Sequence, residues 1–258
     1  MNDADLLALA SRLARAAAEA ILTVRAAGFD VERKDDMSPV TAADRLAEGI
    51  ILEGLRAATP DIPVVAEEEC SAGIETAVAG RFWSVDPLDG TREFAAGRDE
   101  FTVNIGLVVD GRPYLGAVAI PVTGELFTGI LGQGAWKEDA AGRRPIFARA
   151  VPEEGLTVMA SRHYSADPRL DAFLEGRKVA KVIKIGSAVK FCRLAEGAAD
   201  LYPRFGRTME WDTAAPEAVL RAAGGHCTRF DGALLEYGKP GWENPPFVCQ
   251  GSLEPARP

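Results

Sequence analysis

Apolar residues at helical spacing mark two stretches near the start of the chain. In residues 3–26 they recur every three or four positions, which places them on one face of a helix. Residues 42–58 show the same spacing, with Ile51 and Leu55 among the apolar positions. We therefore expect two amphipathic helices in this part of the chain.

Short runs of β-branched and aromatic residues follow, and turn residues separate them. Such runs are typical of strands. The strands are expected in this order: 62–66, 82–86, 101–109, 113–120, 124–130 and 133–138. Asp110-Gly111 lies between two of them and is a strong hairpin signal. The first half of the chain is therefore predicted to form a largely antiparallel sheet.

After about residue 150 the expected strands alternate with helices. The strands are expected at 156–160, 179–185, 199–204, 226–230 and 246–249, and the helices at 167–175, 187–196 and 212–223. Such alternation favours a more parallel, layered arrangement. The segment from Ala140 to Glu154 is the expected boundary between an N-terminal α+β subdomain, residues 1–150, and a C-terminal α/β subdomain, residues 151–258. We expect two α/β layers with a cleft between them.

Composition and charge narrow the class of protein. The chain has 258 residues, of which 47% are hydrophobic, enough to form a large core. Its net charge of −9 argues against nonspecific binding to nucleic acid or to anionic membranes. No apolar stretch reaches the roughly 18 residues of a membrane span, and no signal peptide is expected.

The cysteines and histidines indicate neither a disulfide framework nor a zinc site. The four cysteines are far apart, form no CxxC motif and accompany only two histidines. We interpret the cysteines as reduced and packed, as is usual in a cytoplasmic protein.

Residues 83–91, Trp-Ser-Val-Asp-Pro-Leu-Asp-Gly-Thr, carry the strongest chemical signal. The proline and the glycine argue against a continued strand and against a regular helix. Asp86 and Asp89 are therefore expected on a turn at the end of a strand. Two carboxylates held close repel each other unless a cation lies between them, and such oxygens suit Mg²⁺. The segment predicts a magnesium site, with Gly90 and Thr91 available to a phosphate.

Three further acidic positions allow both a structural and a functional interpretation. Residues 67–69, three glutamates after a strand, form either a solvated turn or part of the aspartate site. Asp212 opens a predicted helix, either as a helix-capping acid or as a metal ligand from across the cleft. Asp44 has the spacing of a capping box with Thr41, and the alternative is that it polarises a water together with Thr91.

Gly186-Ser187, at a predicted strand-to-helix turn, also has two interpretations. The first amides of the following helix can hold a phosphate. Gly-Ser is equally common in ordinary turns and caps, so these residues alone leave the choice open.

Taken together, the motifs resemble those of a known family. Asp-Pro-Leu-Asp-Gly-Thr at 86–91, with Glu67 upstream and Trp211-Asp212 downstream, resembles the inositol monophosphatase superfamily of magnesium-dependent, lithium-sensitive phosphatases. Further segments look like the CysQ-type 3′(2′),5′-bisphosphate nucleotidases: 93–94, 100–105, 186–192 and 201–206. The resemblance runs from about Lys34 to Phe247. It implies an α/β (α+β layered) fold, the αβαβα sandwich of the inositol monophosphatase/fructose-bisphosphatase type.

The resemblance also implies two or three Mg²⁺ ions. Among the glutamates, Glu67 is preferred because it follows the strand directly, and Glu68 is the alternative. The implied ligands are Glu67, Asp86 and the Leu88 carbonyl for the first ion, and Asp86, Asp89 and Asp212 for the second.

Catalytic and substrate-binding roles follow from the same resemblance. Thr91, paired with Asp44, would activate the attacking water, and the amides of Gly90 and Thr91 would hold the phosphate. The implied nucleotide contacts are Gly186, Ser187, Lys190 and His163. His163 is displaced by one position from the family pattern, so Tyr164 is an alternative contact with the base.

The implied activity is hydrolysis of the 3′-phosphate of adenosine 3′,5′-bisphosphate to AMP, which would clear a by-product of sulfate assimilation. The sulfated form of this nucleotide is a second candidate substrate. The alternatives are an inositol monophosphatase or another sugar-phosphate phosphatase, and a non-catalytic module that senses nucleotide or metal. The protein is expected in the cytoplasm, as a monomer or homodimer, and peripheral association with the inner membrane is left open.

Overall fold

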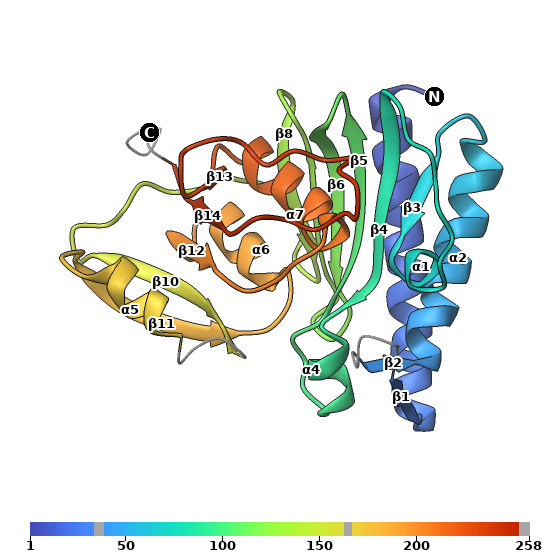
Figure 1. The fold of residues 1–258 in the computed structure, drawn as a ribbon, viewed down its shortest axis with the longest axis horizontal. Coiled ribbons are helices and arrows are strands. Elements are labelled where there is room, and N and C mark those ends of the chain that lie inside the picture. The colour runs from blue at the N-terminus through green and yellow to red at the C-terminus, as the bar shows by residue number, and fades with distance from the viewer. Residues whose placement is uncertain (34–38, 163–166, 253–258) are drawn as a thin grey trace.

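Helices and sheets alternate in five layers (Figure 1). The computed structural model describes residues 1–33, 39–162 and 167–252. Its layers are helices α1 (Asp3–Ala27) and α2 (Ala42–Ala58), a seven-stranded sheet, helices α6 (Val189–Ala195) and α7 (Glu210–Ala222), a five-stranded sheet, and helix α5 (Pro168–Leu174). The expected αβαβα sandwich is confirmed.

The first sheet contains the predicted antiparallel strands. Its order is β3 (Val64–Ala66), β4 (Arg81–Asp89), β5 (Thr102–Val109), β6 (Arg112–Ile120), β7 (Glu125–Ile130), β8 (Gly134–Asp139) and β9 (Gly142–Ile146). Only β3 runs parallel to its neighbour. Asp110 and Gly111 both have positive φ, 49° and 70°, as the predicted tight hairpin requires.

Strand β9 was not expected from the sequence, and its residues lie within the predicted boundary segment. Four of its five residues are exposed, so the strand lacks the alternating apolar pattern that would reveal it. It forms because it pairs with β8 at the edge of the sheet.

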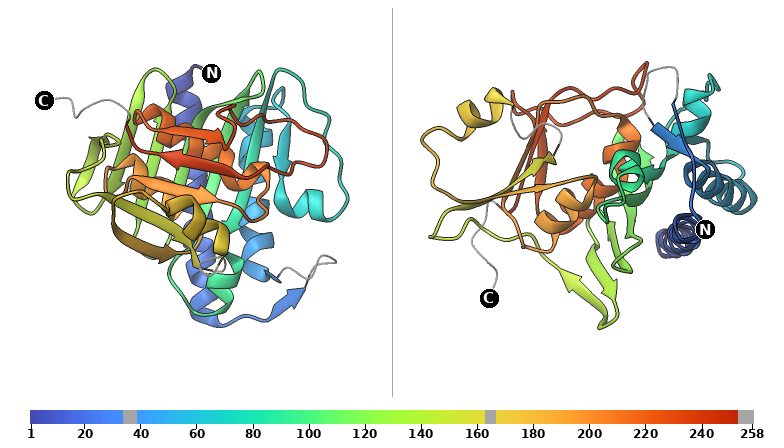
Figure 2. Two further views of the ribbon diagram at one scale, coloured as in Figure 1. Left: turned by 60° about the vertical axis from the view of Figure 1, so that its left-hand side comes forward. Right: turned by 90° about the horizontal axis from the view of Figure 1, so that it is seen from below.

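The two N-terminal helices cover the outer face of this sheet (Figure 2). A capping box in which Asn2 and Asp5 exchange hydrogen bonds starts α1, and Leu9, Ala10 and Ile21 of that helix are buried. Helix α2 spans the predicted residues. No helix in the described part of the chain is both long and apolar enough to cross a membrane.

The second sheet is mixed. Its order is β11 (Val179–Ile185), β10 (Leu156–Ser161), β12 (Leu201–Arg204), β14 (Phe247–Gln250) and β13 (His226–Arg229). The predicted parallel arrangement is confirmed for β10 with β11 and β12. It is wrong for the last two strands, because β14 enters between β12 and β13 and runs antiparallel to both. Residues 147–155 connect the two sheets, and the subdomain boundary expected between Ala140 and Glu154 remains a prediction.

Helix α7 lies between the sheets and packs closely on the first one. A Cβ atom added at Gly106 would lie 2.6 Å from the Ala215 nitrogen, and one at Gly116 would lie 2.1 Å from the Ala215 oxygen. The two glycines therefore let the backbone of α7 touch strands β5 and β6, since no other residue leaves this space empty.

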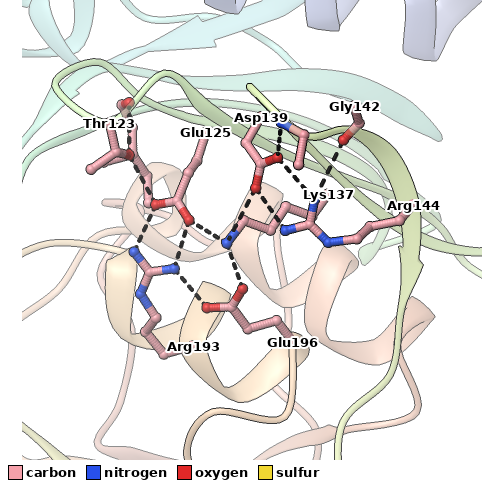
Figure 3. Close-up of polar contacts among 10 residues, drawn as sticks. Thr123, Glu125, Lys137, Asp139, Gly142, Arg144, Arg193 and Glu196 are labelled. Atoms are coloured by element: carbon pink, nitrogen blue, oxygen red, sulfur yellow. Dashed lines mark hydrogen bonds and ion pairs between the residues drawn. The ribbon is translucent and has the colours of Figure 1, made fainter.

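An ion-pair network attaches helix α6 to the same sheet (Figure 3). Lys137 of β8 pairs with Glu125 of β7 and with Glu196 at the end of α6, and Arg193 of α6 pairs with both glutamates. Against the opposing effect of burial, the hydrogen bonds from Arg193 and Lys137 lower the pKa of Glu125 to about 2. The network holds α6 in place, and the first turn of α6 faces the cleft described next.

Candidate active site

A cleft of about 1010 Å³ brings together segments from both halves of the chain. Its walls come from the segment after β3, the β4–α4 turn, the start of α6, strand β12 and the start of α7, together with two loops at 70–78 and 238–242. Three of the predicted metal ligands line the cleft: Glu67, Asp89 and Asp212. The predicted phosphate contacts Gly90 and Thr91 line it as well. Sequence segments more than a hundred residues apart thus share one cavity.

Strand β4 continues through the aspartate motif, which corrects the expected early end of the strand. It runs to Asp89, and its register with β5 shifts between Asp86 and Asp89. This bulge accommodates Pro87, which has no amide to offer to the ladder. Gly90, at φ 102°, then ends the strand, and the short helix α4 (Thr91–Ala95) begins. Asp89 is the last residue of the strand, as predicted, whereas Asp86, which was expected on a turn, lies within the strand and is paired with Asn104.

The four predicted carboxylate ligands form one charge cluster. Asp86 is only 1% exposed and is not among the residues that line the cleft. Burial, followed by the charges of Glu67, Asp89 and Asp212, raises the pKa of Asp86 well above its usual value. Burial, followed by the charges of Asp89 and Glu67, raises the pKa of Asp212 to about 7. Burial, only partly opposed by Lys190, raises the pKa of Asp89 to about 6.

The side chains of this cluster nevertheless point to protein donors. The Leu88 amide donates to Asp86 at 3.0 Å, the Ala188 amide to Asp89 at 2.5 Å and the Met209 amide to Asp212 at 3.0 Å. Within the described residues, no group of three or more His, Cys, Asp or Glu side chains converges as a metal site would require. The chemistry of the donor set fits a hard cation, and cation binding would require these carboxylates to turn.

Asp44 contacts both Thr41, as a helix cap would, and Thr91, as the proposed water-activating pair would. One carboxylate oxygen accepts from the Thr41 amide at 2.8 Å and from its hydroxyl at 2.7 Å, which forms the capping box of α2. The other oxygen accepts from the Thr91 hydroxyl at 3.0 Å. Thr91 also lies 3.1 Å from the Leu88 carbonyl. Because Asp44 is 1% exposed, burial raises its pKa.

Among the three glutamates, Glu67 is better placed than Glu68 to act as a metal ligand from the cleft wall. Glu67 lines the cleft and interacts with Asp86, whereas the cleft walls do not include Glu68. Helix α3 (Glu67–Ser71) was not expected from the sequence. The carboxylate of Glu48 on α2 accepts from the amides of Glu68 and Glu69, at 2.8 and 3.0 Å. Glu48 therefore fixes the first turn that carries Glu67.

The segment at the start of α6 contributes three of the predicted nucleotide contacts to the cleft wall: Gly186, Ser187 and Lys190. A Cβ atom at Gly186 would lie 2.6 Å from the Glu93 side chain, so a larger residue there would displace that side chain. Ser187 has φ 49°. Lys190 is 2% exposed and donates to the Ser187 and Ile185 carbonyls. Burial lowers the pKa of Lys190 to about 7.

Some wall residues were not predicted, and two predicted contacts fall outside the described residues. Arg204, Arg207 and Trp242 line the cleft without having been assigned a role. Arg204 lies in a segment that the resemblance had marked, whereas nothing in the sequence marked the loop of Trp242. His163 and Tyr164 belong to residues 163–166, which the structure does not describe.

Known proteins resemble this chain over most of its length. The model of the inositol monophosphatase family matches residues 2–252. The 3′(2′),5′-bisphosphate nucleotidase CysQ of Salmonella typhimurium is 45% identical over 88% of this chain and 91% of its own. The 3′-phosphoadenosine 5′-phosphate phosphatase of Mycobacterium leprae is 34% identical over 96% of this chain and 90% of its own.

Solved structures show the same fold. CysQ from Bacteroides thetaiotaomicron, a bacterial member of the inositol monophosphatase family, superposes with a TM-score of 0.81 at 33% identity, over 97% of this chain and 98% of the other. An inositol monophosphatase from Anabaena superposes with a TM-score of 0.78 at 26% identity, over 98% and 92% of the two chains.

Proposed function

This chain belongs to the inositol monophosphatase family, and we propose that it hydrolyses the 3′-phosphate of adenosine 3′,5′-bisphosphate to give AMP and phosphate. The observation that carries the proposal is the 45% identity, over most of the chain, to an enzyme named as a 3′(2′),5′-bisphosphate nucleotidase. It is supported by a cleft that gathers acidic, hydroxyl and basic side chains. The sulfated form of the nucleotide is a second proposed substrate.

We assign two or three Mg²⁺ ions to the carboxylate cluster. Glu67, Asp86, Asp89, Asp212 and the Leu88 carbonyl would hold them. The raised pKa values of Asp86 and Asp212 support this assignment, because buried carboxylates that repel one another ionise readily only beside a cation. When bound, Mg²⁺ supplies positive charge that stabilises the phosphate oxygens during an in-line displacement.

Thr91 and Asp44 are proposed to take the proton of the attacking water. The Thr91 hydroxyl donates to Asp44, so the lone pairs of its oxygen stay available to accept a hydrogen from water. The water oxygen forms the new bond to phosphorus, and the bond to the 3′ oxygen breaks. Asp44 receives the proton through Thr91, and its raised pKa makes it a better base at neutral pH. The leaving 3′ oxygen takes a proton from solvent.

The remaining cleft residues are proposed to bind the substrate. The amides of Gly90 and Thr91 would hold the phosphate that is removed. Gly186, Ser187 and Lys190 would contact the rest of the nucleotide. A phosphate near Lys190 would keep its amine protonated despite burial, since a negative charge favours the charged form.

The test is phosphate release from adenosine 3′,5′-bisphosphate compared with inositol 1-phosphate. We expect kcat/KM to be at least about 100-fold higher for the nucleotide, in the range that specific polar contacts provide. Activity should be lost in EDTA and in Asp86→Asn. A preference for inositol 1-phosphate would support the sugar-phosphate phosphatase instead, and tight nucleotide binding without turnover would support a sensing module.

We further propose that the protein acts in the cytoplasm, as a monomer or homodimer. All four cysteines are free thiols in the structure, which suits a reducing compartment. Cell fractionation tests the location, including the proposed alternative of peripheral association with the inner membrane. Light scattering tests the oligomeric state.

A further inference from the structure

Asn104 occupies a position in the first sheet that local preference does not explain. It lies in the middle of β5, is 0% exposed, and is flanked by Val103 and Ile105, which are also fully buried. Asparagine is disfavoured in strands, and a β-branched residue would suit a central strand better. A residue that breaks a local rule without stabilising the fold points to a function.

The side chain of Asn104 has no hydrogen-bond partner within the described part of the chain. Neither its Nδ2 nor its Oδ1 atom has a partner among the residues that the structure describes. Buried amides are almost always hydrogen-bonded, and each exception calls for an explanation. The Ser84 hydroxyl, two residues before Asp86 on β4, is likewise without a partner in this part of the structure.

The register of the sheet places Asn104 beside Asp86. The two residues are directly paired between β5 and β4, and Thr102 is paired in the same way with Asp89. Opposite residues in antiparallel strands point to the same face, with Cβ atoms about 4.5–5.5 Å apart. The Thr102 hydroxyl already lies 3.4 Å from the Asp89 carboxylate. Strand β5 therefore sets one neutral donor opposite each aspartate of the motif.

We propose that Asn104 is a positioning residue: its Nδ2 donates to the Asp86 carboxylate when that carboxylate turns to hold Mg²⁺. In the present structure Asp86 interacts with Glu67 and with the Leu88 amide. A neutral amide suits the role, because lysine or arginine in this place would compete with the cation for Asp86. The inference rests on the proposed function and adds to it a residue outside the predicted ligand set.

Two variants that lack the donor, Asn104→Leu and Asn104→Ala, test the proposal. Leu resembles Asn in shape and has no unpaired polar atoms, whereas Ala leaves a cavity. In the metal-free protein we expect the melting temperature to be no lower than wild type for Leu and to be lower for Ala. Both variants should bind Mg²⁺ about 10-fold more weakly, as measured by calorimetry without substrate.

Activity provides a second readout. The Mg²⁺ concentration for half-maximal activity should rise by the same factor of about 10, while kcat at saturating Mg²⁺ stays within about threefold of wild type. Thr128→Val serves as a matched control, because Thr128 is another buried polar residue, two strands away on β7. It should leave Mg²⁺ binding unchanged.

The possible failures are distinguishable. Unchanged Mg²⁺ affinity in both folded Asn104 variants overturns the positioning role and leaves the proposed phosphatase intact. A kcat that falls as far at saturating Mg²⁺ as below it also overturns the role. A wild-type protein that binds no Mg²⁺ overturns this proposal and the assigned metal site together.

Discussion

At the scale of single residues, Asp44 serves the fold and the proposed chemistry at the same time. One of its oxygens closes the capping box with Thr41, and the other accepts from Thr91. The cap therefore fixes the carboxylate that orients the Thr91 hydroxyl. The two interpretations that the sequence left open are both realised in the geometry.

Removal of the Thr91 hydroxyl should affect catalysis more than stability. We expect Thr91→Val to lower kcat by about 10²- to 10⁴-fold, the usual contribution of a positioned proton acceptor, and to cost only about 1 kcal/mol of stability. Thr91→Ser should retain most of the activity. The control is Thr23→Val, since Thr23 is exposed on α1. Steady-state kinetics and urea unfolding measure the two effects, and a Thr91→Val enzyme with normal kcat would exclude the proposed pair.

At the scale of elements, the placement of Asp212 depends on how closely α7 approaches the first sheet. Asp212 lies in the first turn of α7, and that helix touches β5 and β6 through Gly106 and Gly116. A shift of α7 would therefore move a proposed metal ligand, although neither glycine lies in the cleft wall.

Gly116→Ala should destabilise the protein, whereas Gly49→Ala should stabilise it. A Cβ atom at Gly116 would meet the α7 backbone at 2.1 Å, whereas one at Gly49, in helix α2, would meet nothing within 4 Å. We expect Gly116→Ala to lose on the order of 1–3 kcal/mol, as overpacking does, and also to weaken Mg²⁺ binding. Gly49→Ala should gain about 0.5–1 kcal/mol. Urea denaturation of both variants is the measurement, and equal effects would contradict the packing argument.

The elements that sequence reasoning located are those with strong periodicity. Helix α2 and strand β11 have the predicted bounds. Strand β9, the three-residue strands β1 (Val31–Arg33) and β2 (Pro39–Thr41), and the short helices α3 and α4 were missed. The exposed residues of β9 show no alternation, and helices of five residues contain too few turns to show a period.

At the scale of the whole molecule, this acidic protein buries several carboxylates whose pKa values are raised. Burial raises the pKa values of Glu48, Asp212 and Glu217 to about 7 each. Between their unfolded pKa values, near 4, and about 7, the folded protein holds more protons than the unfolded chain. Because stability falls with pH wherever the folded state binds more protons, their effect is to weaken the metal-free fold as pH rises.

We therefore expect metal-free protein to be more stable at pH 5 than at pH 7. Since one pKa unit corresponds to about 1.4 kcal/mol, each of the three carboxylates should contribute on the order of 2 kcal/mol to the difference. Two groups with lowered pKa values, Glu125 and Lys190, make stability rise with pH instead. Glu125 does so mainly below pH 5 and Lys190 mainly above pH 7, so the chosen range largely avoids both. Urea unfolding in EDTA measures it. Glu217→Gln, a change outside the proposed metal site, should reduce the slope, and a stability that rises from pH 5 to pH 7 would contradict the prediction.

By itself, the sequence determined the longer helices and most strands, the largely antiparallel first sheet, and the candidate site residues at 86–91 and at Asp212. These are local features, because periodicity, turn residues and short motifs act over a few positions. Tertiary structure alone decided that Asp44 bonds to Thr91, that Glu48 caps the turn of Glu67, and that Asn104 faces Asp86. Such contacts depend on strand register and on which faces pack together, and these are set by residues far apart in the chain.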